Sequence, residues 1–312
     1  MAKWTFEPEL TAFVKPKSRD GSYPSLDSYP TRSKPKAEGV NVKRPSIVKR
    51  HVNKSPNIPL ELYRPTVLHL DQDRPSLLAV CLASRRLNAE GKRVLYRRMD
   101  ISQNAETAHM LFFTTILSQK PLALLVEEYR QPNDGFPRYF RKDPLWDLVH
   151  HGLKAMVNLK WLSLETLDQA SNRRRFVEIL RGCAFQLEFF EWYNVSHDEE
   201  TDFLEFLASQ PRLRVLLLPG LKNTSTPIPP RPRLETLRGN RCVMDAFLPG
   251  RRIVSLKWMS DHWNEHFDSI APLSQSLKEI NFLSLGGSFG IRPSLVLLCP
   301  HLRSLEVLEL IA

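Results

Sequence analysis

The sequence predicts an α/β solenoid of strand–helix units, preceded by a small three-helix module and a disordered basic tail. Three observations predict this arrangement. Residues 1–56 are rich in Pro, Ser and Lys, and their apolar residues occur singly without a period. Residues 57–97 space their apolar side chains as three short helices do. Residues 98–312 contain seven spaced copies of one apolar pattern, which indicates stacked repeats.

The composition is that of a globular protein without a membrane segment. Apolar residues make up 42% and charged residues 25%, so there is ample material for a core. The longest apolar runs, such as "PLALLV", are far too short to cross a bilayer. The stretch "MAKWTFEPELTAF" has no apolar segment followed by a cleavage site, so we do not expect secretion. The four cysteines are far apart in the sequence, which predicts neither a disulfide framework nor a zinc site. We therefore expect a cytoplasmic or nuclear protein.

The net charge of +10 is concentrated in the tail. Residues 1–56 hold twelve Lys and Arg against five Asp and Glu, which leaves only +3 for the rest of the chain. This distribution argues against a nucleic-acid-binding fold, although the tail alone could bind nucleic acid, and such binding would weaken steeply with salt. The stretch 41–54, "NVKRPSIVKRHVNK", also fits a nuclear import signal or a kinase site at Ser46, but a solvated charge run is commoner.

The three-helix module follows from apolar spacing and proline positions. Pro65 is expected to begin a helix rather than interrupt one, and Pro75 to begin the next. The third helix, "SRRLNAEGKRVLY", places Leu87, Val94 and Leu95 at helical intervals. Three short helices in about 40 residues cannot bury enough apolar surface to be stable alone. The module is therefore expected to dock on another domain or another protein.

The repeats place apolar residues at offsets 0, 3, 5 and 8 from a first aliphatic residue. Their starts differ by 19 to 28 residues, which is the leucine-rich-repeat range. Helical segments such as "TDFLEFLASQP" lie between them, and "VLYRRMDIS" and "LALLVEEYR" resemble entry units. The last strand has no polar capping unit after it, so we expect an uncovered edge where another chain could pair. The copies begin at Leu159, Leu187, Leu213, Leu234, Ile253, Leu277 and Leu302.

Residues 57–102 resemble an F-box followed by entry into leucine-rich repeats. The resemblance rests on "IPLELY" (58–63), "LLAVCLASRRLN" (77–88) and "VLYRRMDI" (94–101). Together with "SQKPLALLV" and "NLKWLSL", these residues are similar to the fungal class of F-box proteins with degenerate repeats. The sequence departs from the family pattern at Ile58, at Arg64–Pro65, and at Ala83 and Arg86–Leu87.

The resemblance implies a substrate-recognition subunit of an SCF-type cullin–RING ubiquitin ligase. Its helices would bind the SCF adaptor protein and, through it, a cullin, while its repeats would bind a protein target. The chain would hold no cofactor and would catalyse no reaction. A ligase-independent leucine-rich-repeat interaction scaffold is the alternative, and co-purification with the adaptor separates the two. The expected adaptor-binding residues are Pro59, Leu62, Val67, Leu70, Leu77, Val80 and Leu82, although some could instead fill the three-helix core.

The expected target site follows from strand alternation. Residues at offsets 3 and 5 face the core, so residues at offsets 2 and 4 face the opposite side of the sheet. The early repeats place apolar residues there, and later ones place basic residues beside them. The predicted target-binding residues are Trp161, Phe189, Val215, Leu217, Arg238 and Lys257. Substituting either aromatic ring with Glu is expected to release the target with little change in stability, unless the rings are covered.

Three motifs suggest catalysis or metal binding and are better explained otherwise. "GGSFG" (286–290) fits a nucleophile elbow, but the acid-then-histidine order that a triad needs does not follow it. "HWNEH" (262–266) has zinc-ligand spacing, yet a third ligand is missing. "HDEETD" (197–202) is best explained as the acidic start of a helix. We therefore expect no catalytic residue and no metal.

Overall fold

The computed structural model describes residues 59–100, 105–131, 143–164, 176–192, 200–218, 221, 234–260, 270–287 and 295–311. The contacts divide the chain into two units, Met1–Ser55 and Pro56–Ala312, and every described residue belongs to the second. The predicted disordered tail (1–56), the basic stretch 41–54 and "HWNEH" lie outside the described residues, as do Ser288–Gly290 of "GGSFG".

The second unit begins with three helices, as the apolar spacing predicts. They are α1 (Leu60–Leu68), α2 (Arg74–Ala83) and α3 (Arg85–Arg97). The side chain of Asp73 caps α2 by accepting a hydrogen bond from the Ser76 backbone N–H (3.1 Å). The hydrogen bond from the Ser76 hydroxyl, together with this backbone bond, lowers the pKa of Asp73. One expectation is wrong. Pro65 lies inside α1 rather than at its start, because the helix already begins after Pro59.

Nine parallel strands form one open sheet whose strand order follows the chain order from β1 to β9. Every neighbouring pair is parallel, and helix lies in each crossover except that from β5 to β6, most of which is outside the described residues. The predicted entry segments supply β1 and β2. The strands are β1 (Arg98–Asp100), β2 (Glu128–Arg130), β3 (Trp161–Leu164), β4 (Phe189–Trp192), β5 (Val215–Leu217), β6 (Thr236–Gly239), β7 (Ser255–Ser260), β8 (Phe282–Gly287) and β9 (Val307–Leu310).

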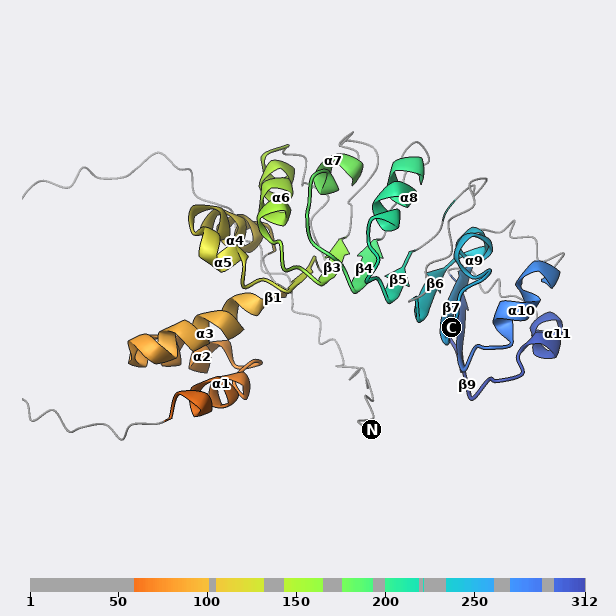
Figure 1. Cartoon of the computed structure of the whole chain (residues 1–312), viewed down its shortest axis with the longest axis horizontal. Coiled ribbons are helices and arrows are strands. Elements are labelled where there is room, and N and C mark those ends of the chain that lie inside the picture. The colour runs from red at the N-terminus through yellow and green to blue at the C-terminus, as the bar shows by residue number, and fades with distance from the viewer. Residues whose placement is uncertain are drawn as a thin grey trace, which may run out of the picture. The chain divides into compact units, whose positions relative to one another are not determined.

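Helices alternate with the strands, and Figure 1 shows α6, α7 and α8 side by side along one face of β3–β5. The predicted helix "TDFLEFLASQP" is confirmed as α8. The helices are α4 (Ala105–Ser118), α5 (Lys120–Ala123), α6 (Asp143–Ala155), α7 (Phe176–Leu180), α8 (Glu200–Ala208), α9 (Arg241–Phe247), η2 (Ala271–Leu273), α10 (Ser274–Leu277), α11 (Leu295–Leu298) and η3 (Cys299–His301).

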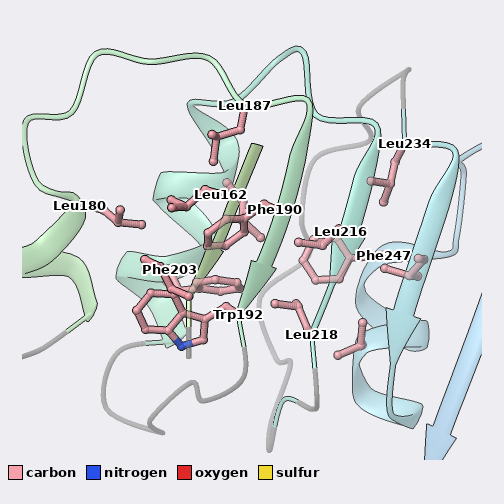
Figure 2. Close-up of a cluster of buried hydrophobic side chains, with 14 of the residues drawn as sticks. Leu162, Leu180, Leu187, Phe190, Trp192, Phe203, Leu216, Leu218, Leu234 and Phe247 are labelled. Carbon is pink, nitrogen blue, oxygen red and sulfur yellow. The ribbon is translucent and has the colours of Figure 1, made fainter. Parts of the chain in front are cut away.

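The main core lies between the strands and these helices. Figure 2 shows Phe190 and Leu216 from neighbouring strands packed with Phe203 of α8 and Phe247 of α9. One residue of each strand occupies the same register position, and from β1 to β8 that residue is buried. These core residues are Met99, Tyr129, Leu162, Phe190, Leu216, Leu237, Leu256 and Leu283.

The register of the last two repeats differs from the prediction by three residues. Leu283 and Leu308 pair with each other and continue the register row that begins at Met99. The sixth and seventh copies therefore begin at Ile280 and Leu305, not at Leu277 and Leu302. As a result Phe282 and Val307 lie at offset 2, on the sheet face opposite the core. The predicted starts would have placed Glu279 and Ser304 there. Apolar residues at offsets 0, 3 and 5 fit both registers in these two segments, and Leu277 instead ends α10.

Strand β9 forms one edge of the sheet, and its side chains are exposed. Val307, Leu308 and Leu310 expose 49%, 42% and 53% of their surface. Leu308 continues the core row of the earlier strands, where every residue from β1 to β8 is buried. This edge is accordingly the least covered part of the sheet among the described strands.

Gly239 is the last residue of β6 and pairs in register with Trp258 of β7. Helix α9 begins only two residues after β6, and it is capped by Asn240, whose Oδ1 accepts from the Val243 backbone N–H (3.1 Å). A Cβ atom on Gly239 would lie 2.6 Å from the Val243 side chain. The short connection between strand and helix therefore requires glycine.

We predict that Gly239→Ala lowers the free energy of unfolding by about 1–3 kcal/mol, because the added methyl group overpacks against the Cβ of Val243. Gly286→Ala is the matched control. A Cβ there would meet Ile311 and the flexible side chain of Met259 at 3.1 Å, so only a small loss is expected. Urea unfolding measures both variants, and equal midpoints would contradict the explanation.

Candidate functional site

Helices α1–α3 bury a small core and leave an apolar surface uncovered. The core contains Val67, Leu77 and Val94, with Leu70, Val80 and Leu87 packed against it in part. Leu62, Leu78 and Leu82 expose 53%, 52% and 88% of their surface. Leu78 and Leu82 are four residues apart on α2 and therefore lie on one face of that helix. These exposed leucines make this side of the module a candidate docking surface.

The seven predicted adaptor-binding residues differ in how much of their surface is exposed. Pro59, Leu62 and Leu82 are exposed, and Leu70 and Val80 are half-buried. Val67 and Leu77 expose 0% and 1%, so they hold the three helices together and cannot contact a partner in this arrangement. Their assignment to the interface is thus corrected.

Two further leucines of this module are exposed. Leu78 lies four residues before Leu82 on α2, and Leu68 exposes 39% of its surface at the end of α1. The exposure of Leu78 agrees with the expectation that Leu62→Asp with Leu78→Asp would disturb a surface for the adaptor. Leu68 instead lines a hollow with Glu90, Arg97 and Leu124. We call Leu62, Leu78 and Leu82 the exposed leucine surface.

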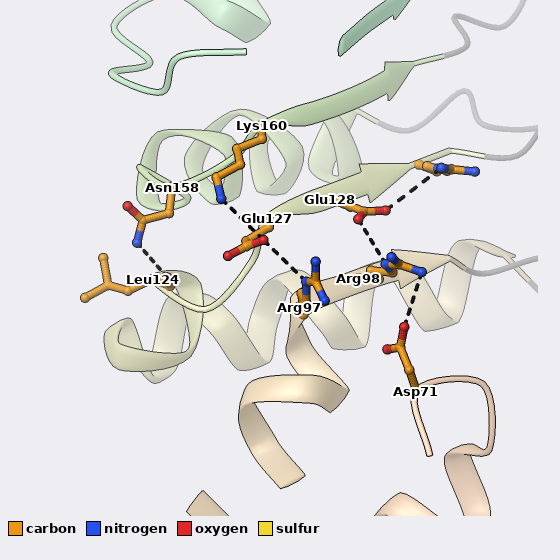
Figure 3. A network of polar contacts seen from close by, with 9 residues as sticks. Asp71, Arg97, Arg98, Leu124, Glu127, Glu128, Asn158 and Lys160 are labelled. Atoms are coloured by element: carbon orange, nitrogen blue, oxygen red, sulfur yellow. Dashed lines mark hydrogen bonds and ion pairs between the residues drawn. The ribbon is translucent and has the colours of Figure 1, made fainter. Parts of the chain in front are cut away.

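Charged side chains connect this module to the sheet (Figure 3). The last residue of α3, Arg97, lies 3.3 Å from Glu127, and the same carboxylate lies 3.5 Å from Lys160. The next residue, Arg98, is 2.9 Å from Glu128 and 3.3 Å from Asp71, which follows α1.

This network orients the helices relative to the first strands. Each exposed ion pair contributes at most about 1 kcal/mol. The pairs act together with the backbone, since the Glu127 N–H donates to the Arg97 carbonyl (2.9 Å) and α3 continues directly into β1. A partner bound to the helices would therefore be held in a defined orientation relative to β1 and β2.

The predicted target-binding residues lie in two adjacent rows on the sheet face opposite the main core. Trp161 pairs in register with Phe189, Phe189 with Val215, and Leu217 with Arg238, which pairs with Lys257. We call these six residues the strand-face patch. Phe189 is buried but lies outside the main core cluster, which agrees with its outward position. The structure therefore brings all six predicted residues together.

The aromatic end of the strand-face patch is stacked. The rings of Trp161 and Phe189 lie parallel with centroids 3.6 Å apart, and the guanidinium of Arg130 lies 4.4 Å from the centroid of the Trp161 ring. Trp161 is half-buried, whereas Phe189 exposes only 8% of its surface. This burial corrects the expectation that Phe189→Glu would leave stability unchanged. The contribution of Arg130 was not predicted, because the seven aligned repeats did not include β2.

The basic end of the strand-face patch lies on β6 and β7. Arg238 is 3.8 Å from Glu191, and the Glu191 carboxylate also accepts a hydrogen bond from the Ser163 hydroxyl (2.9 Å). Lys257 is half-buried and, within the described residues, makes no ion pair. Val215 and Leu217 on β5 are half-buried and separate the aromatic end from the basic end.

Burial shifts the pKa values of three described groups, His109, Tyr129 and Cys183. The Tyr129 hydroxyl lies 3.0 Å from His109 Nδ1; burial lowers the pKa of His109 to about 4 and raises that of Tyr129. Burial also raises the pKa of the Cys183 thiol to about 12, so this thiol stays protonated at neutral pH.

The described ranges contain no metal-ion candidate, since nowhere in them do three His, Cys, Asp or Glu side chains gather suitably. No helix among the described elements is both long enough and apolar enough to cross a membrane. Comparison of the chain with protein-family models, with curated proteins and with solved structures finds no match in any of the three.

Proposed function

We propose that this chain is a substrate-recognition subunit of an SCF-type cullin–RING ubiquitin ligase. In this proposal α1–α3 are an F-box, and the exposed leucine surface docks on the adaptor protein, which binds the cullin. One observation carries the proposal. The same three helices that contain the F-box-like motifs at residues 58–63 and 77–88 leave Leu62, Leu78 and Leu82 exposed.

We propose further that β1–β9 and their helices are degenerate leucine-rich repeats stacked into a solenoid. Three features support this. The strand order follows the chain order, and each repeat contributes one strand in the same register to a continuous parallel sheet. Each repeat contacts its sequence neighbours, as stacked repeats do. Such a surface would bind a protein target at the strand-face patch.

The proposed role involves no chemistry by this chain. A ligase subunit of this kind raises the local concentration of the target near the transferred ubiquitin, which is catalysis by proximity. The ion pairs of Arg97 and Arg98 with the first strands would serve that role, because they limit how far the target-binding sheet can move relative to the docked helices. The place of action would be the cytoplasm or the nucleus, where the SCF ligases work.

Co-purification tests this proposal. The full chain is expressed with a recombinant SCF adaptor and then with the adaptor and a cullin, and the mixtures are separated by size-exclusion chromatography. We expect the chain to elute with the adaptor and to bring the cullin with it only when the adaptor is present. Separate elution of chain and adaptor at micromolar concentration would contradict the proposal.

A ligase-independent interaction scaffold is the second candidate. It is favoured by one observation, namely that Val67, Leu77 and Val94 pack into a core of their own, so the helices could simply cover the first strands. The scaffold predicts target binding without adaptor binding.

A further inference from the structure

A hollow of about 240 Å³ lies between the three-helix module and the turn that leads into β2. Helix α1 lines it with Arg64 and Leu68, which are four residues apart and share a face of the helix. On the side of the turn, the carbonyl of Leu124 accepts a hydrogen bond from Asn158 Nδ2 (2.7 Å), which fixes the backbone there (Figure 3). Helix α3 contributes a stripe with helical spacing, made of Glu90, Arg93, Val94 and Arg97. Three separate segments of the chain therefore build the hollow.

Both carboxylates that line the hollow already have basic partners. Glu90 accepts a hydrogen bond from the Arg93 guanidinium (3.0 Å). Glu127 accepts one from Arg97 (3.3 Å) and also lies 3.5 Å from the ammonium of Lys160. The negative charge of the lining is thus neutralised within the protein.

Positive charge exceeds negative charge however the hollow is bounded. Its lining contains three arginines and two carboxylates, and Lys160 adds a fourth basic group beside Glu127. The whole of α1, α3 and the segment 120–127 holds seven Lys and Arg against three Asp and Glu. Arg64 forms no ion pair within the described part of the chain, although Glu61 lies one turn before it on α1. Each guanidinium has five N–H donors, so the three arginines offer more donors than two carboxylates can accept.

Aliphatic side chains form the rest of the lining. Val94 is buried, whereas Leu68 and Leu124 expose 39% and 49% of their surface, and Leu125 is half-buried. The volume of the hollow is below the range of roughly 300–1,000 Å³ that is typical of sites for drug-sized ligands. An occupant is therefore small, of the size of a short chain or a single ring, with an anionic end and an apolar body.

We propose that this hollow binds a small organic anion with one carboxylate or phosphate group on a short aliphatic or aromatic body. The anionic group lies against Arg64 and Arg93, because planar guanidinium groups suit bidentate contacts with either oxyanion. The body lies against Leu68 and Leu124. Arg64 is one of the residues at which this sequence departs from the F-box pattern, so the proposed site does not follow from that resemblance. The inference needs neither the exposed leucine surface nor the strand-face patch, so it is independent of the proposed function.

A titration of the full chain with small probes, followed by ligand-observed NMR, tests this inference. Phenyl phosphate and phenylacetate carry the two anionic groups. Phenylacetamide keeps the ring without the charge, and inorganic phosphate keeps the charge without the ring. We expect at least one of the aromatic anions to bind with a Kd of about 1 mM or tighter, and both comparison probes to bind at least about tenfold more weakly. The ratio of the two aromatic anions identifies the preferred oxyanion. Absence of binding by both aromatic anions, or equal binding of phenylacetamide, would overturn the inference.

A substitution at Arg64 locates the site. Arg64→Gln should weaken binding of the preferred aromatic anion at least about tenfold, and because Arg64 is exposed, circular dichroism should show an unchanged fold. Arg212→Gln is the matched control, since Arg212 is equally charged and exposed but lies before β5, outside the hollow. The control should bind the anion as the unmodified chain does. Unchanged binding by the Arg64 variant, or equal weakening by both variants, would show that the anion does not occupy this hollow.

Discussion

The double substitution Leu62→Asp with Leu78→Asp is expected to reduce adaptor binding by at least about 100-fold, because two carboxylates would be buried in a docked apolar interface. The fold should survive. The two leucines expose 53% and 52% of their surface in the free chain, so neither substitution removes a large part of the small core around Val67 and Leu77.

Adaptor titration and circular dichroism measure the two halves of this prediction. Leu111→Asp is the matched control, because Leu111 on α4 exposes 64% of its surface and lies outside the three-helix module. The control should bind the adaptor normally. Undiminished binding by the double variant would show that the adaptor does not contact these leucines. A loss of helicity would instead place the leucines in the core.

Phe189→Glu is expected to destabilise the chain by about 3 kcal/mol or more, because it removes a large buried ring and places a carboxylate where little water reaches. The substitution also abolishes the stacking on Trp161 at 3.6 Å. The new carboxylate would lie on the same face of β4 as Glu191, which adds repulsion.

Phe282→Glu is the control for this second prediction. Phe282 occupies the same outward row on β8 but is only half-buried, so its loss should be clearly smaller. Denaturant unfolding of both variants gives the comparison. A Phe189 variant as stable as the unmodified chain would show that the ring is free to leave the sheet, and would return it to the set of partner-contacting residues.

The positions of the strands and of most helices were predictable because each strand satisfies a local pattern. Offsets 3 and 5 are apolar in the early repeats, and burial of Leu162 and Leu164, or of Phe190 and Trp192, requires that pattern. The register of the last two copies was not predictable in this way. Leu277 and Leu302 satisfy the same spacing as Ile280 and Leu305, and only pairing with the preceding strand distinguishes them.

The surfaces were predicted less completely than the strands, because exposure depends on contacts between distant segments. Strand alternation placed Phe189 on the outward face correctly, but the pattern does not show that the Trp161 ring of the neighbouring strand stacks on it. In the helices, a residue that packs inward, such as Val67, has the same apolar character as one that remains exposed, such as Leu62. Only the packing of α3 against α1 and α2 separates the two.

Hydrogen–deuterium exchange of the full chain, with and without saturating adaptor, tests most directly whether the helices and the strand face have separate roles. We expect exchange to slow in α1 and α2, where docking restrains local opening, and to stay unchanged in β3–β7. Slower exchange in those strands, or no change in either helix, would contradict the assignment of adaptor docking to the exposed leucine surface.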